Sequence, residues 1–283
     1  MKRAMQLKAR MKQVAREKGI SAQLALQNYM LERLLERISL SAYRRNFVLK
    51  GGLLISAMAG LAARTTMDMD GTIRRVPATP ESLVRMFRKI CAVPVEDGVS
   101  FVVKRAEEIR ESDEYSGVRL ALEAKCPPMA VPLKVDVTAG DKITPREIAY
   151  DYPLRVDGRT IRILAYNVET ILAEKLETIL SRGDLNTRMR DFYDVHLLQS
   201  LLNRKIEREV LGKALTATMR RRGTLPLLKQ HEEIMRTIAA SPAMAAHWQN
   251  YRRDYSYARG MEFAEACRAI AWLLRRIVPA KSR

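Results

Sequence analysis

The sequence predicts an α+β protein in which a sheet-containing core is followed by a helical region. Two observations predict this fold class. Most segments between residues 47 and 164 alternate between apolar and polar residues as half-buried strands do, whereas the segments after residue 168 repeat with the period of amphipathic helices. A chain of 283 residues is long enough for two such regions, each with its own core. We therefore expect N-terminal helices over 1–45, the core over 46–165 and a C-terminal helical bundle over 166–283.

The charge of the chain limits the partners that it favours. Its 50 Lys and Arg residues outnumber its 32 Asp and Glu residues, so the formal net charge is +18. A field this positive favours polyanionic partners and adds a salt-dependent affinity for nucleic acid. Only 6% of the residues are aromatic, so a base-stacking platform is not the expected mode of binding.

The cysteines and the hydropathy indicate the compartment. Cys91, Cys126 and Cys267 are isolated and lack zinc-site spacing, which favours a reducing environment over a disulfide scaffold. The basic N-terminus lacks the apolar stretch of a signal peptide. No run approaches the ~18 apolar residues of a membrane span. We therefore expect a soluble, cytoplasmic protein with no membrane partner.

Two helices are predicted before the core. Residues 1–18 carry seven cations against the single acid Glu17, which indicates either a solvated helix face or an arm that contacts RNA. Ser21 is predicted to cap a second helix whose apolar stripe ends near Ile38.

The core is predicted to begin with a strand, a tight turn and a helix. An apolar strand from Phe47 leads into Gly51-Gly52, and a helix is expected from about 53 to 63. Glycines without side chains let a ligand approach the backbone, and the N-terminus of the helix would stabilise a phosphate there. Lys50, which precedes the turn, is a further candidate for phosphate binding.

The next strand carries two carboxylates. Because alternate residues of a strand share a face, we expect Asp68 and Asp70 to project together with Thr66, and Met67 and Met69 to point into the core. Carboxylates about 7 Å apart on one strand face could share Mg²⁺. A glycine pair alone is usually only a turn, and an Asp-x-Asp alone is usually a solvated strand end. Together and in this order they indicate that the protein handles a nucleoside triphosphate.

Further strands and one helix complete the predicted core. A helix is expected over 81–90, a half-buried strand over 118–125, and a hairpin turn at Asp157-Gly158, whereas 101–109 fits a strand or a helix.

A third carboxylate, Asp136, lies on the strand predicted over Leu133–Thr138, where alternation places it with Lys134 on the polar face. Alone it would be an ordinary polar residue, but beside the other two acids it is a candidate site residue.

Charged residues interrupt the apolar stripes of the first two C-terminal helices. Lys175 falls on the stripe of the helix that begins near Val168, where its ammonium either reaches solvent or meets an anion. Asp191 and Asp194 lie on the stripe of the next helix, and buried acids are costly unless paired or coordinating. We expect all three to face the catalytic site, and we expect Lys175→Met to leave the fold intact.

Six segments in order resemble one known family. Together they are similar to the AbiEii/AbiGii nucleotidyltransferases, which are toxins of type IV toxin–antitoxin and abortive-infection systems within the DNA polymerase β-like superfamily. The segments are residues 29–38, 47–52, 64–70, 134–137, 172–178 and 188–194.

The resemblance implies a polymerase β-type nucleotidyltransferase core with a mixed sheet, and transfer of nucleotides from NTP to an RNA acceptor. In characterised relatives the acceptor is the tRNA 3′ end, and the transfer inhibits translation. It also implies a cognate antitoxin. The sequence departs from the family at Leu53, where a serine is common, and at Gly71, where we expect the strand to bend early.

The resemblance and the residues together suggest a division of roles. Asp68 and Asp70 would hold one or two Mg²⁺ ions, and Asp136 would complete the metal site or accept the proton of the acceptor hydroxyl. The amides of Gly51 and Gly52, with Lys175 and more weakly Lys50, would hold the triphosphate. Asp191 and Asp194 would orient Lys175 or the nucleotide.

Two other classes of function stay open. One is a nucleotidyltransferase that acts on a small molecule, as antibiotic-modifying enzymes do, or on a protein. The other is a non-catalytic basic RNA-binding protein, which would explain the charge but not the ordered acids.

Overall fold

The computed structural model describes residues 2–110 and 116–278, which form two compact units. The sheet unit comprises residues 1–141 and 147–165, and the helical unit comprises 142–146 and 166–283. The segment 142–146, which the sequence assigns to the core, therefore groups with the helical unit. In the part of the chain that is described, no helix is long and apolar enough to cross a membrane.

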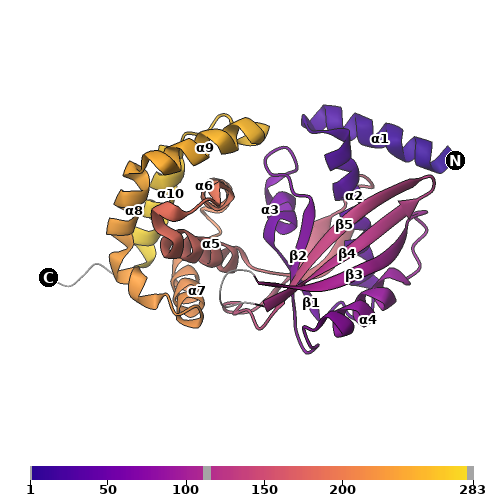
Figure 1. Ribbon diagram of the computed structural model, residues 1–283, viewed down its shortest axis with the longest axis horizontal. Coiled ribbons are helices and arrows are strands. Elements are labelled where there is room, and N and C mark those ends of the chain that lie inside the picture. Colours follow the sequence, from indigo (N-terminus) through magenta and orange to yellow (C-terminus); the bar gives the residue numbers. More distant parts are fainter. Residues whose placement is uncertain (1, 111–115, 279–283) are drawn as a thin grey trace. The chain divides into compact units, whose positions relative to one another are not determined.

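The sheet unit contains a mixed sheet with helices packed against it (Figure 1). The strands follow the order β3-β4-β5-β2-β1-β7-β6, in which β2 pairs with β5 and β1 with β7 in parallel, and the other pairs are antiparallel. The predicted mixed sheet is confirmed. Its elements are α1 (Lys2–Lys18), α2 (Ala22–Leu40), β1 (Phe47–Lys50), α3 (Gly51–Ala59), β2 (Asp68–Ile73), α4 (Pro80–Cys91), β3 (Ser100–Arg110), β4 (Ser116–Cys126), β5 (Met129–Ala139), β6 (Ile148–Pro153) and β7 (Thr160–Ala165).

The two faces of this sheet differ in polarity. Met69 of β2 pairs with Val135 of β5, and both side chains are fully buried. Phe47 lies on the same face and meets Phe87 of α4 edge to face, with ring centroids 6.3 Å apart. Because strand residues alternate, Asp70 and its neighbours in the sheet project from the opposite face.

Gly71 makes room for an aromatic ring and does not bend the strand. β2 continues past it to Ile73, and Gly71 pairs with Leu49 on one side and Val137 on the other. A Cβ at this position would lie 2.3 Å from Cζ of Phe47. The predicted early bend is therefore wrong, since the strand continues regularly. A glycine is needed here because the ring of Phe47 occupies the space that a side chain would need.

The start of β2 also differs from the prediction. The strand begins at Asp68, so Thr66 and Met67 precede it, and the Met67 side chain is 47% exposed and does not point into the core. Met69 is buried as predicted.

Residues 100–110 form the strand β3, which decides between the strand and the helix expected for 101–109.

The N-terminal helices pack on each other and on the sheet. Ser21 caps α2, since its hydroxyl accepts a hydrogen bond from the amide of Leu24 at 3.1 Å, as predicted. Met11 and Ala15 of α1 are buried, while the cations of this helix between residues 8 and 18 are exposed. The side chains of residues 2 and 3 lie outside the described part. The RNA-contacting role of α1 stays a prediction.

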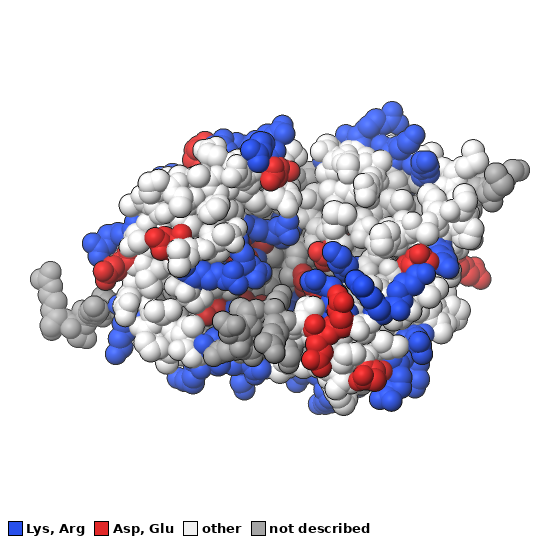
Figure 2. Space-filling view, viewed as in Figure 1, with Lys and Arg blue, Asp and Glu red and all other residues white. Residues whose placement is uncertain are grey.

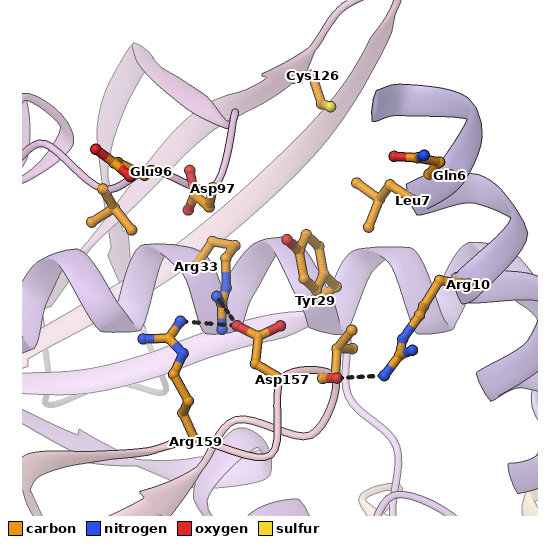
Figure 3. A pocket seen from close by; sticks show the side chains of 12 residues that line it. Gln6, Leu7, Arg10, Tyr29, Arg33, Glu96, Asp97, Cys126, Asp157 and Arg159 are labelled. Atoms are coloured by element: carbon orange, nitrogen blue, oxygen red, sulfur yellow. Dashed lines mark hydrogen bonds and ion pairs between the residues drawn. The ribbon is translucent and has the colours of Figure 1, made fainter. Parts of the chain in front are cut away.

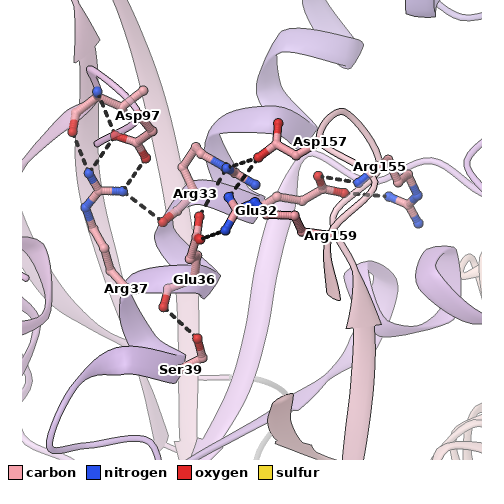
Figure 4. A network of polar contacts seen from close by, with 10 residues as sticks. Glu32, Arg33, Glu36, Arg37, Ser39, Asp97, Arg155, Asp157 and Arg159 are labelled. Carbon is pink, nitrogen blue, oxygen red and sulfur yellow. Dashed lines mark hydrogen bonds and ion pairs between the residues drawn. The ribbon is translucent and has the colours of Figure 1, made fainter. Parts of the chain in front are cut away.

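A network of ion pairs fixes α2 to the turn between β6 and β7 (Figure 4). Glu32 accepts hydrogen bonds from the amide and guanidinium of Arg155 at 3.2 and 3.3 Å, and Arg155 also donates to Ser56 of α3. Burial raises the pKa of Glu32 to about 7, although Arg155 opposes the shift. The same helix carries Arg33 and Arg37, whose guanidinium groups pair with carboxylates outside α2.

The helical unit contains amphipathic helices close to those predicted. They are α5 (Val168–Arg182), α6 (Met189–Leu202), α7 (Arg208–Arg221), α8 (His231–Ala240), α9 (Pro242–Asp254) and α10 (Phe263–Ile277). α10 packs against α6, α7 and α8. Its buried residues Ile270 and Leu274 are four residues apart and lie on the predicted apolar stripe.

Candidate active site

A row of charged side chains crosses the polar face of the sheet. Asp70 of β2 is opposite Asp136 of β5 on one side and opposite Lys50 of β1 on the other. Asp136 is in turn opposite Arg119 of β4. Residues paired across strands project from the same face, so the register brings two acids from distant parts of the sequence side by side, between an arginine and a lysine.

The glycine turn lies directly against this row. Gly51 has a φ of +67°, and a Cβ there would lie 2.1 Å from Oδ2 of Asp70. Only a glycine can therefore occupy this position while Asp70 keeps its place. The amide of Gly52 donates to the same oxygen at 3.3 Å. The structure thus brings the predicted glycine pair and the predicted acid together at the N-terminus of α3, which begins at Gly51 and not at residue 53.

Lys50 is held by an acid that the sequence analysis missed. Its ammonium lies 2.8 Å from Oδ2 of Asp141, which also accepts a hydrogen bond from the hydroxyl of Thr138 at 2.6 Å. The signal for Asp141 is weak, because it follows the end of β5 and belongs to no alternating pattern.

Asp136 is engaged by an arginine that was also not predicted. The guanidinium of Arg119 donates to both carboxylate oxygens, at 2.8 and 2.6 Å. The hydrogen bonds from this pair raise the pKa of Arg119. The alternation of residues 118–125 does place Arg119 on the polar face, but nothing in a single strand indicates which partner lies on the next one.

Two carboxylates of the sheet could bind a magnesium ion together with substrate phosphates. Among the residues that the structure describes, no three His, Cys, Asp or Glu side chains form a group that could hold a metal. Mg²⁺, however, is commonly bound by one or two carboxylates together with substrate phosphates and water. Asp68 and Asp70 could supply such carboxylates, and the Asp136 carboxylate, which already accepts from Arg119 with both oxygens, has further lone pairs for a third contact.

The structure resolves the position of Lys175 in the helical unit. Its Nζ lies 2.7 Å from Oδ1 of Asp191 and 2.7 Å from Oδ2 of Asp194, and its side chain is 14% exposed. The lysine is therefore held inward by anions and does not reach out to solvent. Asp194 is fully buried, and Asp191 also pairs with Arg188 at 3.2 Å.

The electrostatics of this cluster correct one expectation. Burial alone would lower the pKa of Lys175, but the two carboxylates outweigh it and the pKa is raised. Lys175→Met would leave two buried acids without their cation, so from the structure we expect this substitution to destabilise the fold.

The sheet unit also has a hollow that differs from the row of acids. It encloses about 670 Å³ and lies among α1, α2 and the turn between β6 and β7 (Figure 3). Asp157 accepts from both Arg33 and Arg159 there, and Arg10 donates to the carbonyl of Val156. Its cations are thus already matched by acids and carbonyls, which makes it a poor site for a triphosphate.

Comparison with known proteins agrees with this geometry. The fold is that of the polymerase β-like nucleotidyltransferases. Residues 33–276 match the family described as nucleotidyl transferase AbiEii toxin, type IV toxin–antitoxin system, and the chain belongs to this family. It is therefore a nucleotidyltransferase toxin, and its family implies a cognate antitoxin.

Solved structures share the fold at low sequence identity. MenT4, a nucleotidyltransferase toxin from Mycobacterium tuberculosis H37Rv, is 18% identical with a TM-score of 0.56, and the match covers 95% of this chain and 99% of that one. JHP933 from Helicobacter pylori is 13% identical with a TM-score of 0.52, and the match covers 91% and 92% of the two chains. No curated protein matches the sequence significantly.

Proposed function

We propose that this protein transfers nucleotides from NTP to an RNA acceptor, the 3′ end of tRNA, and so inhibits translation and growth. The observation that carries the proposal is the contact between the Gly51-Gly52 turn and Asp70, beside Asp136 in the same row. Phosphoryl-type transfer depends on positioning and charge neutralisation, and a backbone turn at a helix N-terminus beside carboxylates serves both needs.

The residues of the sheet unit have separate tasks in this proposal. Asp68 and Asp70 would hold Mg²⁺, which would supply neutralisation of the charge on the triphosphate. The amides of Gly51 and Gly52 hold phosphate oxygens. Asp136 accepts the proton of the acceptor hydroxyl, and Arg119 fixes the orientation of its carboxylate.

The roles of the helical cluster rest on the family resemblance. Lys175 binds the triphosphate in this proposal, and Asp191 and Asp194 orient its ammonium, as their two 2.7 Å contacts allow.

The charge favours RNA over a small-molecule acceptor. Lys and Arg side chains occur over much of the face drawn in Figure 2, in line with the net charge of +18. Such a field increases the affinity for a polyanion and offers nothing to a small neutral acceptor. Action on tRNA would place the protein in the cytoplasm.

Incubation with labelled NTP and total tRNA tests the proposal. Asp68→Asn and Asp70→Asn should each lower the transfer rate at least ~100-fold, because each removes a carboxylate from the proposed metal site. A ~100-fold loss corresponds to ~2.7 kcal/mol of transition-state stabilisation. Asp151→Asn, which changes an exposed acid of β6 in the same sheet, is the matched control and should keep the wild-type rate.

Three outcomes would contradict parts of the proposal. Wild-type transfer in either variant would refute the metal-site assignment. Growth arrest by the Asp68→Asn protein equal to that by wild type would assign toxicity to binding alone. RNA binding that does not weaken as salt rises would favour the small-molecule alternative.

A further inference from the structure

We propose that a basic groove in the helical unit binds the sugar–phosphate backbone of RNA. The groove encloses about 620 Å³ and lies along α7 and the end of α10. The choice of RNA as the polyanion rests on the proposed function, whereas the existence of an anion-binding groove does not. Its walls are formed chiefly by Arg208, Gly212, Lys213, Thr216, Arg220 and Arg276.

The spacing along α7 gives the groove its shape. Arg208, Gly212, Thr216 and Arg220 are four residues apart and share one face of the helix. The arginines at the two ends are about 18 Å apart along the helix axis at ~1.5 Å per residue, which is enough to span several phosphates. Gly212 and Thr216, which lie between the two arginines, are small and do not fill the groove. Gly212 in particular lies close to the end of α10, where an added Cβ would be 3.5 Å from the carbonyl oxygen of Ile277.

The cations of the groove exceed its acids. Lys213 pairs with Glu209 at 2.5 Å, which neutralises both. Arg208, Arg220 and Arg276 are exposed, and no carboxylate within the described ranges forms an ion pair with any of them. The three guanidinium groups therefore give the groove a positive charge that a ligand can match.

The arginines near the end of α7 are used in two different ways: some pair with acids of the fold, and others line the groove. Arg222, two residues after Arg220, is bound to Glu177 and is thereby used within the fold. Arg276 stacks on Trp272, with its guanidinium carbon 3.9 Å from the ring centroid, which fixes its direction at the edge of the groove.

The lining fits a nucleic acid better than an acidic protein. Protein interfaces are typically built around buried aromatic and other large apolar side chains, and only Ala217 and Ile277 contribute apolar side chains here. Guanidinium groups match phosphate oxygens in bidentate geometry, and such contacts supply sequence-independent affinity. The groove thus positions an RNA without reading its bases.

A comparison of two triple variants of the full chain tests this inference. The groove variant replaces Arg208, Arg220 and Arg276 with glutamine. The matched control replaces Arg204, Arg236 and Arg268, which are exposed arginines of the same unit outside the groove, so both proteins lose three charges. Binding of unfractionated tRNA, of an oligouridylate and of polyglutamate is measured from 50 to 500 mM salt, with Tm recorded for each protein.

The groove variant should lose ~3 phosphate contacts. Its plot of log K against log salt should flatten by about 2 to 3, and its affinity at 0.1 M salt should fall roughly 100-fold or more, since each contact contributes ~0.7–0.9 to the slope. The control should lose much less. Equal losses in both variants would overturn the groove and assign binding to the overall field. Loss of polyglutamate binding with RNA binding unchanged would overturn it in favour of an acidic protein.

The same proteins separate this inference from the proposed function. If the groove variant binds and transfers like wild type, the groove assignment fails and the proposed function stands. If the wild-type protein binds RNA through the groove but transfers no nucleotide, the proposed function fails and the groove stands. Should the triple variant melt early, the three single Arg→Gln variants, each expected to lower the slope by about 0.7 to 0.9, decide in its place.

Discussion

Replacing Lys175 with methionine removes the cation that lies between two acids of α6. The ammonium is 2.7 Å from both Asp191 and Asp194, and Asp194 is fully buried. Removing one partner of a buried pair typically costs ~3–5 kcal/mol, because the charge left behind has lost its hydration and gains no replacement. Methionine keeps the packing of the stem, so the loss measures the charge. We expect a melting temperature lower by roughly 10 °C.

Urea denaturation of matched variants is the assay. Lys213→Met removes the same group from an exposed pair, which solvent screens, and should cost much less. Lys175→Met combined with Asp194→Asn should recover part of the loss, with a coupling energy of ~1–3 kcal/mol. If Lys175→Met is as stable as Lys213→Met, the buried triad does not hold α5 and α6 together. KM and kcat for the NTP, measured where the variant is folded, then test whether Lys175 also binds the triphosphate.

Two further predictions concern the sheet unit. Gly71→Ala should lower the free energy of unfolding by ~1–3 kcal/mol, because its Cβ would overlap the ring of Phe47. Adding Phe47→Leu should restore part of this loss. If the two substitutions have simply additive effects in urea denaturation, the overlap is contradicted. Glu32 keeps its proton up to pH about 7 in the folded protein but releases it near 4.5 when unfolded, so the wild type should lose up to ~3 kcal/mol of stability as pH rises between these values, and Glu32→Gln should not. A stability difference between the two proteins that stays constant from pH 4 to 8 would contradict the raised pKa.

Much of the fold follows from local patterns in the sequence. The periods of two and 3.6 residues located the strands and helices, and Ser21 marked the start of α2 because capping is a local interaction. The role of Gly71 was misjudged because the glycine makes room for the ring of Phe47, which lies 24 positions earlier in the chain on a neighbouring strand. Met67 was misjudged because strand alternation applies only from Asp68 onward.

The candidate site was predictable in its members and less so in their partners. Asp68, Asp70 and Asp136 stand out because the acids follow a glycine pair in a fixed order, not because any one of them is unusual alone. Arg119, which pairs with Asp136, and Asp141, which pairs with Lys50, could not be found: the first contact depends on the register between β4 and β5, and the second on the path of the chain after β5. The aromatic content of 6% is an average that likewise hides the local pairing of Trp272 with Arg276.

The parallel pairing of β2 with β5 has a consequence for how the toxin is made. Asp70 and Asp136 can meet only after β3, β4 and β5 have been synthesised, because β3 and β4 separate β2 from β5 along the chain although β2 and β5 are neighbours in the sheet. Such non-local pairings form late, because the entropy of the intervening chain opposes them until the whole sheet is in place. A chain that ends before β5 therefore holds the Gly51-Gly52 turn, Asp68 and Asp70 but not Asp136, so its row of charges is incomplete. The proposed transfer therefore requires a chain that extends beyond β5.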